Sequence, residues 1–213
     1  MDMKQTLISG LPELKLDLTQ AQTDTLCAFG QAVIDQNQVM NLTAITEPQQ
    51  VAKLHLLDSL TVLSALDLRG KSLIDVGCGA GFPGVPLAIA SPQTQVTLLD
   101  SLGKRVNWLK EILPQLGVSA QCVTARAEEA VADRRESYDY AVSRAVARLN
   151  ILLELLAPYV KVGGAVVAMK GSAAKEELAE CAGAMKKLGL QQEAFLEFPV
   201  DGASHAVIIL RKV

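Results

Sequence analysis

The residues with the clearest chemical use in this chain are three glycines at every second position, Gly77, Gly79 and Gly81, and a carboxylate further along, Asp100. Glycine has no Cβ, so such a loop can turn sharply and let its backbone approach a ligand closely. Asp100 ends the next apolar run, where a carboxylate can accept hydrogen bonds from both hydroxyl groups of a ribose. This combination predicts a binding site for a nucleotide-like cofactor.

The elements around the glycines agree with this prediction. Leu73–Val76 is an apolar run with one acid near its end, which is typical of a buried parallel strand. Pro83 follows the glycines at a point where a helix could begin, and the first turn of that helix would offer free N–H groups. A strand, a glycine turn and a helix in this order hold nucleotide-like cofactors in open α/β sheets.

The glycines match a dinucleotide fingerprint poorly. A G-x-G-x-x-G pattern that starts directly after the strand, at Gly77, fails because Phe82 occupies the place of the last glycine. Gly79, Gly81 and Gly84 satisfy the pattern, but that turn would lie away from the end of the strand. The spacing therefore leaves the cofactor open at this point.

A second interpretation starts from the acid of the strand. The pattern D-x-G-x-G-x-G, from Asp75 to Gly81, resembles the first motif of class I S-adenosylmethionine (SAM) methyltransferases, whose loop passes under the methionine part of the cofactor. Asp100 fits both cofactors, because NAD and SAM carry the same ribose.

The order of elements favours SAM. From Ser72 onward strands and helices alternate, which indicates a parallel sheet with right-handed crossovers. The last two strands are joined by a short turn at Asp201-Gly202 with no helix between them, and such a terminal antiparallel hairpin is usual for the methyltransferase fold and uncommon for NAD domains. We expect strands at Leu73–Val76, Val96–Asp100, Ala120–Thr124, Tyr138–Ser143, Ala165–Lys170, Ala194–Phe198 and His205–Lys212.

The N-terminal part is expected to be helical. Thr19 to Gln22 has the spacing of a capping box, and Thr46-Glu47-Pro48 is a second helix start. The predicted fold is therefore α/β, a class I SAM-dependent methyltransferase (Rossmann-like) sheet that is mostly parallel with a terminal antiparallel hairpin. Its expected parts are an N-terminal helical extension over residues 1–70, packed on a SAM-binding core over residues 71–213.

Composition limits the other classes of protein. The chain has 213 residues, half of them hydrophobic, which suits one domain with appendages. No apolar run approaches the ~18 residues of a membrane span and no signal peptide opens the chain, so we expect a cytoplasmic protein. Four scattered cysteines and two histidines make a metal site or a disulfide framework unexpected. A net charge of −3 argues against a general nucleic-acid binder.

Several short segments have a recognisable order and spacing. They are Asn41–Ile45, His55–Ser59, the glycine loop, Leu98–Arg105, Ser143–Ala145 and Met169–Gly171. Together they resemble the bacterial small-subunit rRNA guanine-N7 methyltransferases, also called glucose-inhibited division protein B, over nearly the whole chain. The string DSLGKR is the most specific part, because generic methyltransferases do not share it. Two positions depart from the family pattern: Gln36 replaces a tryptophan, and Leu54 replaces a residue that is commonly basic.

Motifs that are missing constrain the reaction. Methylation of an exocyclic adenine amine typically uses an Asn/Asp-Pro-Pro-aromatic turn after the fourth strand, where this chain has Ser143-Arg144-Ala145-Val146. Methylation of a pyrimidine C5 typically uses a cysteine after a proline, and no cysteine here follows a proline. Guanine N7 already carries an unprotonated lone pair, so its methylation needs alignment and exclusion of water rather than a catalytic acid, base or nucleophile.

The resemblance implies a cofactor-binding role for eight residues. The glycines would pass against the methionine part, and Ala127 and Glu128 match the adenine position of the family. Phe82 would line the cofactor pocket or pack in the core. Arg144 would pair with the cofactor carboxylate or an RNA phosphate, or form a structural ion pair. The eight are Gly77, Gly79, Gly81, Phe82, Asp100, Ala127, Glu128 and Arg144.

No residue is expected to act as a catalytic acid, base or nucleophile, and Arg144 and Lys170 are candidates for positioning only. Lys170 is also a phosphate candidate, and a place in the core explains His55 equally well. The implied partner is small-subunit (16S) rRNA in a folded or ribosomal context, bound by a monomer without a metal ion. The RNA-binding candidates are Asn41, His55, Lys104, Arg105, Arg148 and Lys170.

Other functions stay open at this point. A non-catalytic regulatory module that binds a nucleotide would explain the glycine loop, and a SAM methyltransferase could act on another RNA. An NAD-dependent reductase is expected to contain a Tyr-x-x-x-Lys or similar pair. No lysine lies four residues after Tyr138, Tyr140 or Tyr159.

Overall fold

The computed structural model describes residues 2–144, 147–200 and 202–213. Ala145 and Val146 of the segment after the fourth strand, and Asp201 of the predicted turn, lie outside the described residues. In chain order the elements are α1 (Met3–Gly10), η1 (Leu11–Leu14), α2 (Gln20–Asn37), α3 (Pro48–Val51), η2 (Ala52–Leu57), α4 (Asp58–Ala65), β1 (Ser72–Val76), α5 (Gly84–Ala90), β2 (Gln95–Asp100), α6 (Gly103–Gln115), β3 (Gln121–Thr124), α7 (Ala127–Ala130), η3 (Val131–Asp133), β4 (Tyr138–Arg144), α8 (Leu149–Leu156), η4 (Ala157–Tyr159), β5 (Val160–Lys170), α9 (Ala174–Glu180), α10 (Ala182–Leu188), β6 (Leu190–Val200) and β7 (Ala203–Lys212).

The strands form one seven-stranded sheet in the order β3-β2-β1-β4-β5-β7-β6. Strands β1 to β5 pair in parallel, whereas β7 pairs antiparallel with both β5 and β6. The predicted parallel sheet with a terminal antiparallel hairpin is therefore confirmed. The strand order reverses between β1 and β4, and open α/β sheets bind ligands outside the carboxyl ends of the strands at such a point.

Two strands begin four or five residues earlier than predicted. β5 starts at Val160, but Gly163 interrupts its apolar pattern, and its register with β4 shifts between Tyr138 and Tyr140. β6 starts at Leu190 at the edge of the sheet, and Gln191 and Gln192 pair through their backbone with β7 while their side chains are exposed. Exposed positions near the start of each strand interrupt the apolar alternation, so the sequence pattern could not show these starts.

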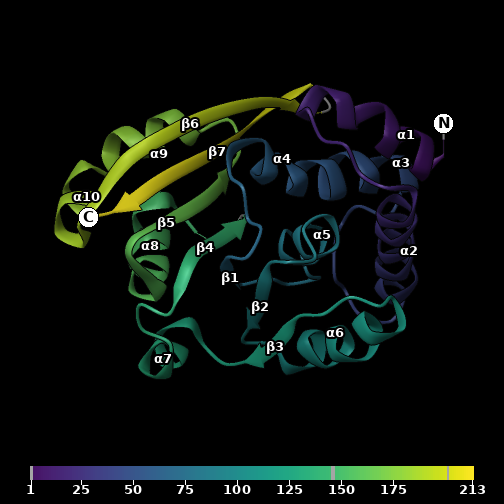
Figure 1. Ribbon diagram of the computed structural model, residues 1–213, viewed down its shortest axis with the longest axis horizontal. Helices are drawn as coiled ribbons and strands as arrows, with labels where there is room; N and C mark the ends of the chain where they lie inside the picture. Colours follow the sequence, from purple (N-terminus) through teal and green to yellow (C-terminus); the bar gives the residue numbers. More distant parts are fainter. Residues whose placement is uncertain (1, 145–146, 201) are drawn as a thin grey trace.

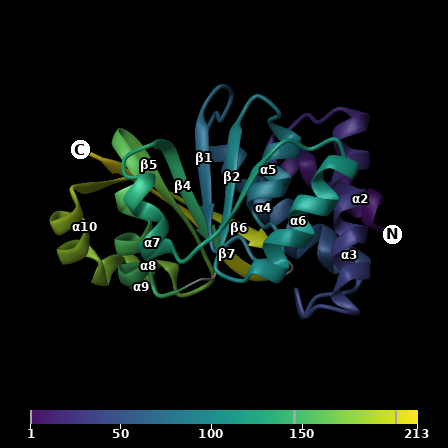
Figure 2. The ribbon, with the colours of Figure 1, turned by 90° about the horizontal axis from the view of Figure 1, so that it is seen from below.

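Helices cover both faces of the sheet, which gives three layers (Figures 1 and 2). The N-terminal helices, α5 and α6 lie on one face, and α7 to α10 lie on the other. The fully buried side chains of Leu73 and Ile74 enter the first and second core respectively. Burial on both faces explains why the strands are continuous apolar runs.

The N-terminal helices share a hydrophobic core with one face of the sheet. The capping box of Thr19 and Gln22 starts α2, and α3 starts at Pro48, as predicted. The π-helical turn η2, which joins α3 to α4, was not predicted. Phe29 of α2 contacts Phe82, next to the glycine loop, with ring centroids 5.3 Å apart, so these helices support the loop. The division of the chain at residue 70 stays a prediction. None of the helices in the described ranges is long and apolar enough to span a bilayer.

Candidate functional site

The glycine loop connects β1 to α5 at the carboxyl edge of the sheet. Gly77, Gly79 and Gly81 have φ angles of 76°, 55° and 96°, a left-handed region that residues with a Cβ rarely adopt. A Cβ on Gly81 would lie only 2.7 Å from the side chain of Val85, so packing also requires glycine there. The loop has the conformation that the spacing of the glycines predicts.

Asp100 holds this loop from the end of β2. Its Oδ2 accepts a hydrogen bond from the Gly79 N–H group (2.9 Å), and its Oδ1 accepts one from the Leu102 N–H group (2.8 Å). An ionised carboxylate has about four acceptor positions, so the same group can still accept ribose hydroxyls. Asp100 therefore fixes the loop and keeps acceptor capacity for a ligand.

A cavity of about 240 Å³ lies over β1 to β3, and we name it the β1–β3 cavity. It brings together four of the predicted cofactor-binding residues: Gly77, Asp100, Ala127 and Glu128. The buried hydroxyl of Tyr159 donates to the Ala127 carbonyl (2.5 Å) and fixes that wall. The residues that line the β1–β3 cavity are Val76, Gly77, Leu99, Asp100, Ser101, Ala125, Arg126, Ala127, Glu128 and Leu155.

A second, larger cavity of about 580 Å³ lies over the ends of β4 and β5, and we name it the β4–β5 cavity. It brings together the sequence candidates His55, Arg144 and Lys170, which come from η2, β4 and β5. Its volume lies within the range of about 300–1,000 Å³ that is usual for small-molecule sites. Its lining is Ile45, Leu54, His55, Asp58, Arg144, Met169, Lys170, Gly171, Ser172, Ala173, Glu177 and His205.

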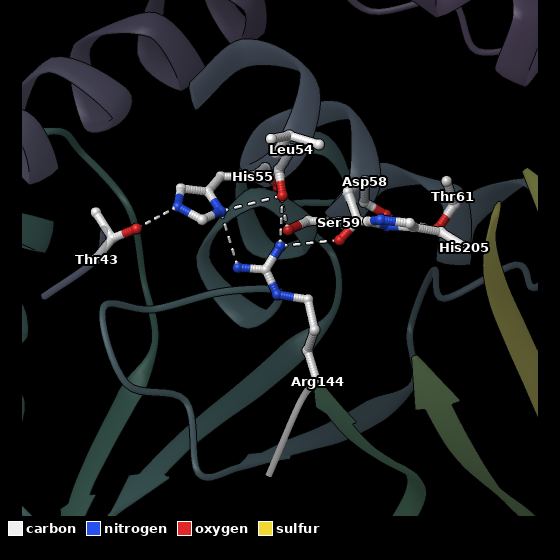
Figure 3. A network of polar contacts seen from close by, with 8 residues as sticks. All are labelled: Thr43, Leu54, His55, Asp58, Ser59, Thr61, Arg144 and His205. Atoms are coloured by element: carbon white, nitrogen blue, oxygen red, sulfur yellow. Dashed lines mark hydrogen bonds and ion pairs between the residues drawn. The ribbon is translucent and has the colours of Figure 1, made fainter. Parts of the chain in front are cut away.

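Arg144 extends from the end of β4 to the N-terminal helices (Figure 3). One guanidinium nitrogen donates to the Leu54 carbonyl and to Asp58 Oδ2, both at 2.9 Å. The other lies 3.2 Å from His55 Nδ1. Asp58 is 4% exposed, and its Oδ1 lies 2.7 Å from Nδ1 of His205 on β7. One buried carboxylate thus joins Arg144 to His205.

Phe82 packs beneath this network. Its ring stacks on His55 with centroids 4.7 Å apart, and the Arg144 guanidinium carbon lies 5.2 Å from its centroid. Phe82 is 5% exposed and lines neither cavity. The structure shows the core-packing alternative for Phe82, and its contact with the cofactor stays a prediction.

The two ring nitrogens of His55 are both engaged. Nε2 lies 2.8 Å from Thr43 Oγ1, which accepts a bond from the Ile45 N–H group. Nδ1 lies 3.0 Å from the Leu54 carbonyl, to which a protonated Nδ1 donates, and 3.2 Å from the Arg144 guanidinium, from which an unprotonated Nδ1 accepts. Burial, followed by the charge of Arg144, lowers the pKa of His55 from 6.5 to about 4, so His55 is neutral at physiological pH.

The lowered pKa of His55 predicts that the free energy of unfolding depends on pH. The unfolded chain binds the His55 proton at a higher pH than the folded chain does, so stability falls as pH drops from 6.5 to about 4, by about 3 kcal/mol. Burial raises the pKa of Asp75 to about 7, and this shift acts in the opposite direction over the same range. Urea unfolding of wild type and His55→Gln at several pH values isolates the His55 contribution. A difference between the two proteins that does not change with pH contradicts a neutral, buried His55.

Lys170 and Arg148 are both engaged in ion pairs. Lys170 Nζ lies 2.8 Å from Glu177 Oε2 and donates to the Ala147 carbonyl at the same distance. Glu177 Oε2 also accepts from the Leu149 N–H group at the start of α8 (2.6 Å). Arg148 pairs with Glu180 on the surface (2.7 Å). The RNA-binding role of both basic residues stays a prediction.

The remaining RNA candidates lie near the glycine loop. Arg105 donates to the Asn41 carbonyl at 3.3 Å, and its guanidinium lies 3.9 Å from the position that a Cβ of Gly79 would take. Lys104 is exposed on the first turn of α6. The structure therefore places Arg105 beside Asn41, and Lys104 directly precedes Arg105 on α6.

The site residues predicted from the sequence do not include Asp58, Glu177 and His205, all of which line the β4–β5 cavity. Asp58 lies one helical turn after His55, and this spacing was the available signal. Glu177 and His205 lie on α9 and β7, and no local pattern links them to Arg144. The sequence also gave no sign of the π turn η2, in which the Leu54 carbonyl accepts from Arg144.

Asp75 has an acceptor without a partner beneath the loop. Its Oδ2 accepts from the Gly84 N–H group (2.7 Å), whereas the fully buried Oδ1 has no hydrogen-bond partner in the described part of the chain. Buried polar atoms are almost always satisfied, so this oxygen indicates a missing donor beside the glycine loop.

Comparison with known proteins identifies the family. The sequence model of the family described as rRNA small subunit methyltransferase G matches residues 22–205. The chain belongs to this family. The ribosomal RNA small subunit methyltransferase G of Alkaliphilus oremlandii is 41% identical and covers 100% of this chain and 92% of the relative. That of Halalkalibacterium halodurans is 42% identical, with 95% and 87% covered. The resemblance drawn from the sequence is confirmed.

Solved structures confirm the fold class. A SAM-dependent methyltransferase from Aquifex aeolicus superposes with a TM-score of 0.58 at 17% identity, covering 84% of this chain and 98% of that chain. Precorrin-6y C5,15-methyltransferase from Geobacter metallireducens gives a TM-score of 0.54 at 13% identity, covering 81% and 92%. The cofactor of this family is SAM. The residues present suit this cofactor, because Asp75 has a buried acceptor without a partner beside the glycine loop, in the described part of the chain, and Asp100 lines the β1–β3 cavity with acceptor capacity for ribose hydroxyls.

Asp100→Ala is expected to weaken SAM binding by roughly 1.5–3 kcal/mol, the usual loss of hydrogen bonds to a charged group. It also leaves the Gly79 and Leu102 N–H groups without their acceptor, so the free energy of unfolding falls by about 1–3 kcal/mol. Calorimetry with SAM and urea unfolding measure the two effects. Asp100→Asn keeps one acceptor oxygen, so its SAM affinity and its free energy of unfolding should lie between those of wild type and Asp100→Ala. Equal SAM affinity in all three proteins removes Asp100 from the site.

Proposed function

We propose that this chain transfers the methyl group of SAM to N7 of a guanine in small-subunit (16S) rRNA. The observation that carries the proposal is the presence of two cavities on either side of the β1–β4 reversal. The β1–β3 cavity has the residues for adenosine, and the β4–β5 cavity has room for a base. The relatives at about 40% identity are ribosomal RNA methyltransferases by name, which supports rRNA as the substrate.

The residues of the site suit a reaction that needs positioning alone. Bound SAM supplies a methyl group on a sulfonium sulfur. Asp100 holds the ribose, and Ala127 and Glu128 face the adenine. Guanine N7 has its own lone pair, so no side chain has to remove a proton. Ile45 and Met169 give the β4–β5 cavity an apolar wall that excludes water around the base.

The substrate form follows from the charge of the chain. A net charge of −3 gives weak attraction for naked RNA, so we infer that folded rRNA or a ribosomal particle presents shape and several phosphates together. We further propose that the protein acts as a monomer in the cytoplasm, where ribosomal subunits are assembled.

Methylation in vitro tests this function. Purified protein and SAM are mixed with small subunits from cells that lack the protein, with rRNA stripped of ribosomal proteins, or with short oligonucleotides. Mass spectrometry of nucleoside digests should find 7-methylguanosine, with the subunits or folded rRNA as the best substrates. SAM binding without methylation of any RNA would favour the regulatory alternative. Methylation of other RNAs alone would place the substrate elsewhere.

A further inference from the structure

Two ion pairs form the polar wall of the β4–β5 cavity. Arg144 pairs with Asp58 at 2.9 Å, and Lys170 pairs with Glu177 at 2.8 Å. The four side chains are between 4% and 18% exposed, so solvent screens their charges weakly. Arg144 and Lys170 therefore each have a carboxylate partner.

The Lys170–Glu177 pair is held firmly. Lys170 also donates to the Ala147 carbonyl, and Glu177 also accepts from the Leu149 N–H group. Burial acts to raise the pKa of Glu177, but the hydrogen bonds from Lys170 and Leu149, together with nearby positive charge, outweigh it and lower this pKa, which keeps the carboxylate ionised at neutral pH. A lysine that is 9% exposed and bonded to two oxygens is poorly placed to capture an RNA phosphate.

We propose, on the basis of the proposed function, that Glu177 is a positioning residue that neutralises Lys170 so that the β4–β5 cavity can hold a purine ring while the ring becomes positively charged. In this assignment Lys170 is one half of an ion pair and not a phosphate ligand. The ligand class is an uncharged purine base that leaves as a cation.

The charge balance of the reaction gives the reason. The N7 lone pair forms the new N–CH₃ bond, and the S–CH₃ bond breaks with its electron pair going to sulfur. The positive charge of the sulfonium therefore moves onto the guanine ring, and no proton is transferred. An unpaired ammonium group beside the ring would oppose this movement of charge, whereas a paired one is nearly neutral.

The other titratable groups of the wall are two histidines. His55 has a pKa of about 4 and adds no charge at neutral pH. His205 bonds to Asp58 at 2.7 Å, and its pKa is raised chiefly by that hydrogen bond. Every variant in the test below retains His205, so its charge is the same in each comparison.

A double-mutant cycle on the ion pair tests the proposal. Glu177→Gln keeps an oxygen for the Leu149 N–H group but leaves Lys170 unpaired, and kcat should fall about tenfold or more, as one charge a few ångströms away predicts. Lys170→Met should not raise KM for small subunits. The double variant should recover most of the lost kcat, because it restores neutrality. Glu154→Gln breaks an exposed ion pair with Lys187 and is the matched control, with both constants unchanged.

A binding measurement gives a readout that does not depend on turnover. Wild type and Glu177→Gln, each loaded with S-adenosylhomocysteine, are titrated with small subunits that carry or lack the methyl group. Glu177→Gln should lose affinity for the methylated subunits about tenfold more than for the unmethylated ones, because only the product base is a cation.

The opposite results would overturn the assignment. A raised KM in Lys170→Met with unchanged kcat makes Lys170 a phosphate ligand. A double variant worse than either single variant shows that each side chain makes its own contact with the substrate. If urea unfolding shows that Glu177→Gln does not fold, Lys170→Met decides the matter through KM. In all of these outcomes the wild-type protein still methylates small subunits. Failure of the proposed function would instead be the absence of methylation by the wild-type protein.

Discussion

A strain that lacks this protein is expected to lose one 7-methylguanosine from its small-subunit rRNA, and re-expression should restore it completely. The expectation rests on the family match and on the two cavities: the β1–β3 cavity, lined by Gly77 and Asp100, which we propose as the SAM site, and the β4–β5 cavity, which has room for the base. Methylation of N7 needs no catalytic acid or base from either cavity. Mass spectrometry of digested rRNA measures the nucleoside directly.

Two variants in the same strain connect this result to the site. Arg144→Ala should fail to restore the modified nucleoside, because Arg144 lines the β4–β5 cavity and joins it to the N-terminal helices. Arg69→Ala should restore it fully, since Arg69 forms only an exposed ion pair with Asp67. Immunoblots of the soluble fraction establish that both proteins are present. An unchanged level of 7-methylguanosine in the deletion strain contradicts the assignment, whatever the SAM affinity.

The fold was largely predictable because its signals are local. Each parallel strand is an apolar run bounded by turn residues. The terminal hairpin was predictable because only a short turn near Gly202, with no helix, separates the last two strands. The early starts of β5 and β6 were missed, because Gly163 and exposed polar residues hide the backbone pairing. The signal for a strand is the burial of its side chains, and these segments have little of it.

The grouping of the candidate cofactor-binding residues in one cavity was predictable for the same reason. Gly77 and Asp100 are fixed by the ends of β1 and β2, and parallel strands bring those ends together. The partners of Arg144 were not predictable, since they come from η2, α4 and β7 and are brought together only by tertiary packing. Lys170 and Glu177 are close in sequence, but Lys170 ends β5 and Glu177 lies on α9, so their spacing alone does not indicate an ion pair.

Arg144→Ala is also expected to destabilise the folded chain, by about 3 kcal/mol. Removing one partner of a buried ion pair costs about 3–5 kcal/mol because the other charge is left uncompensated, and here His205 still bonds to Asp58 and limits the loss. The Leu54 carbonyl and His55 Nδ1 also lose their contacts with the guanidinium. Urea unfolding of wild type and variant measures the difference.

Three further variants test whether this loss of stability comes from the buried charge of Asp58. Arg69→Ala, which breaks an ion pair whose side chains are 72% and 60% exposed, should change the free energy of unfolding by less than about 1 kcal/mol. Asp58→Asn alone should be destabilising, because it removes the negative charge between Arg144 and His205 and one of the two carboxylate oxygens that they contact. Arg144→Ala combined with Asp58→Asn should be more stable than the sum of the single losses predicts, because no uncompensated carboxylate remains. Strict additivity of the two losses would show that Asp58 and Arg144 contribute independently, and that the ion pair between β4 and α4 does not hold the N-terminal helices on the sheet.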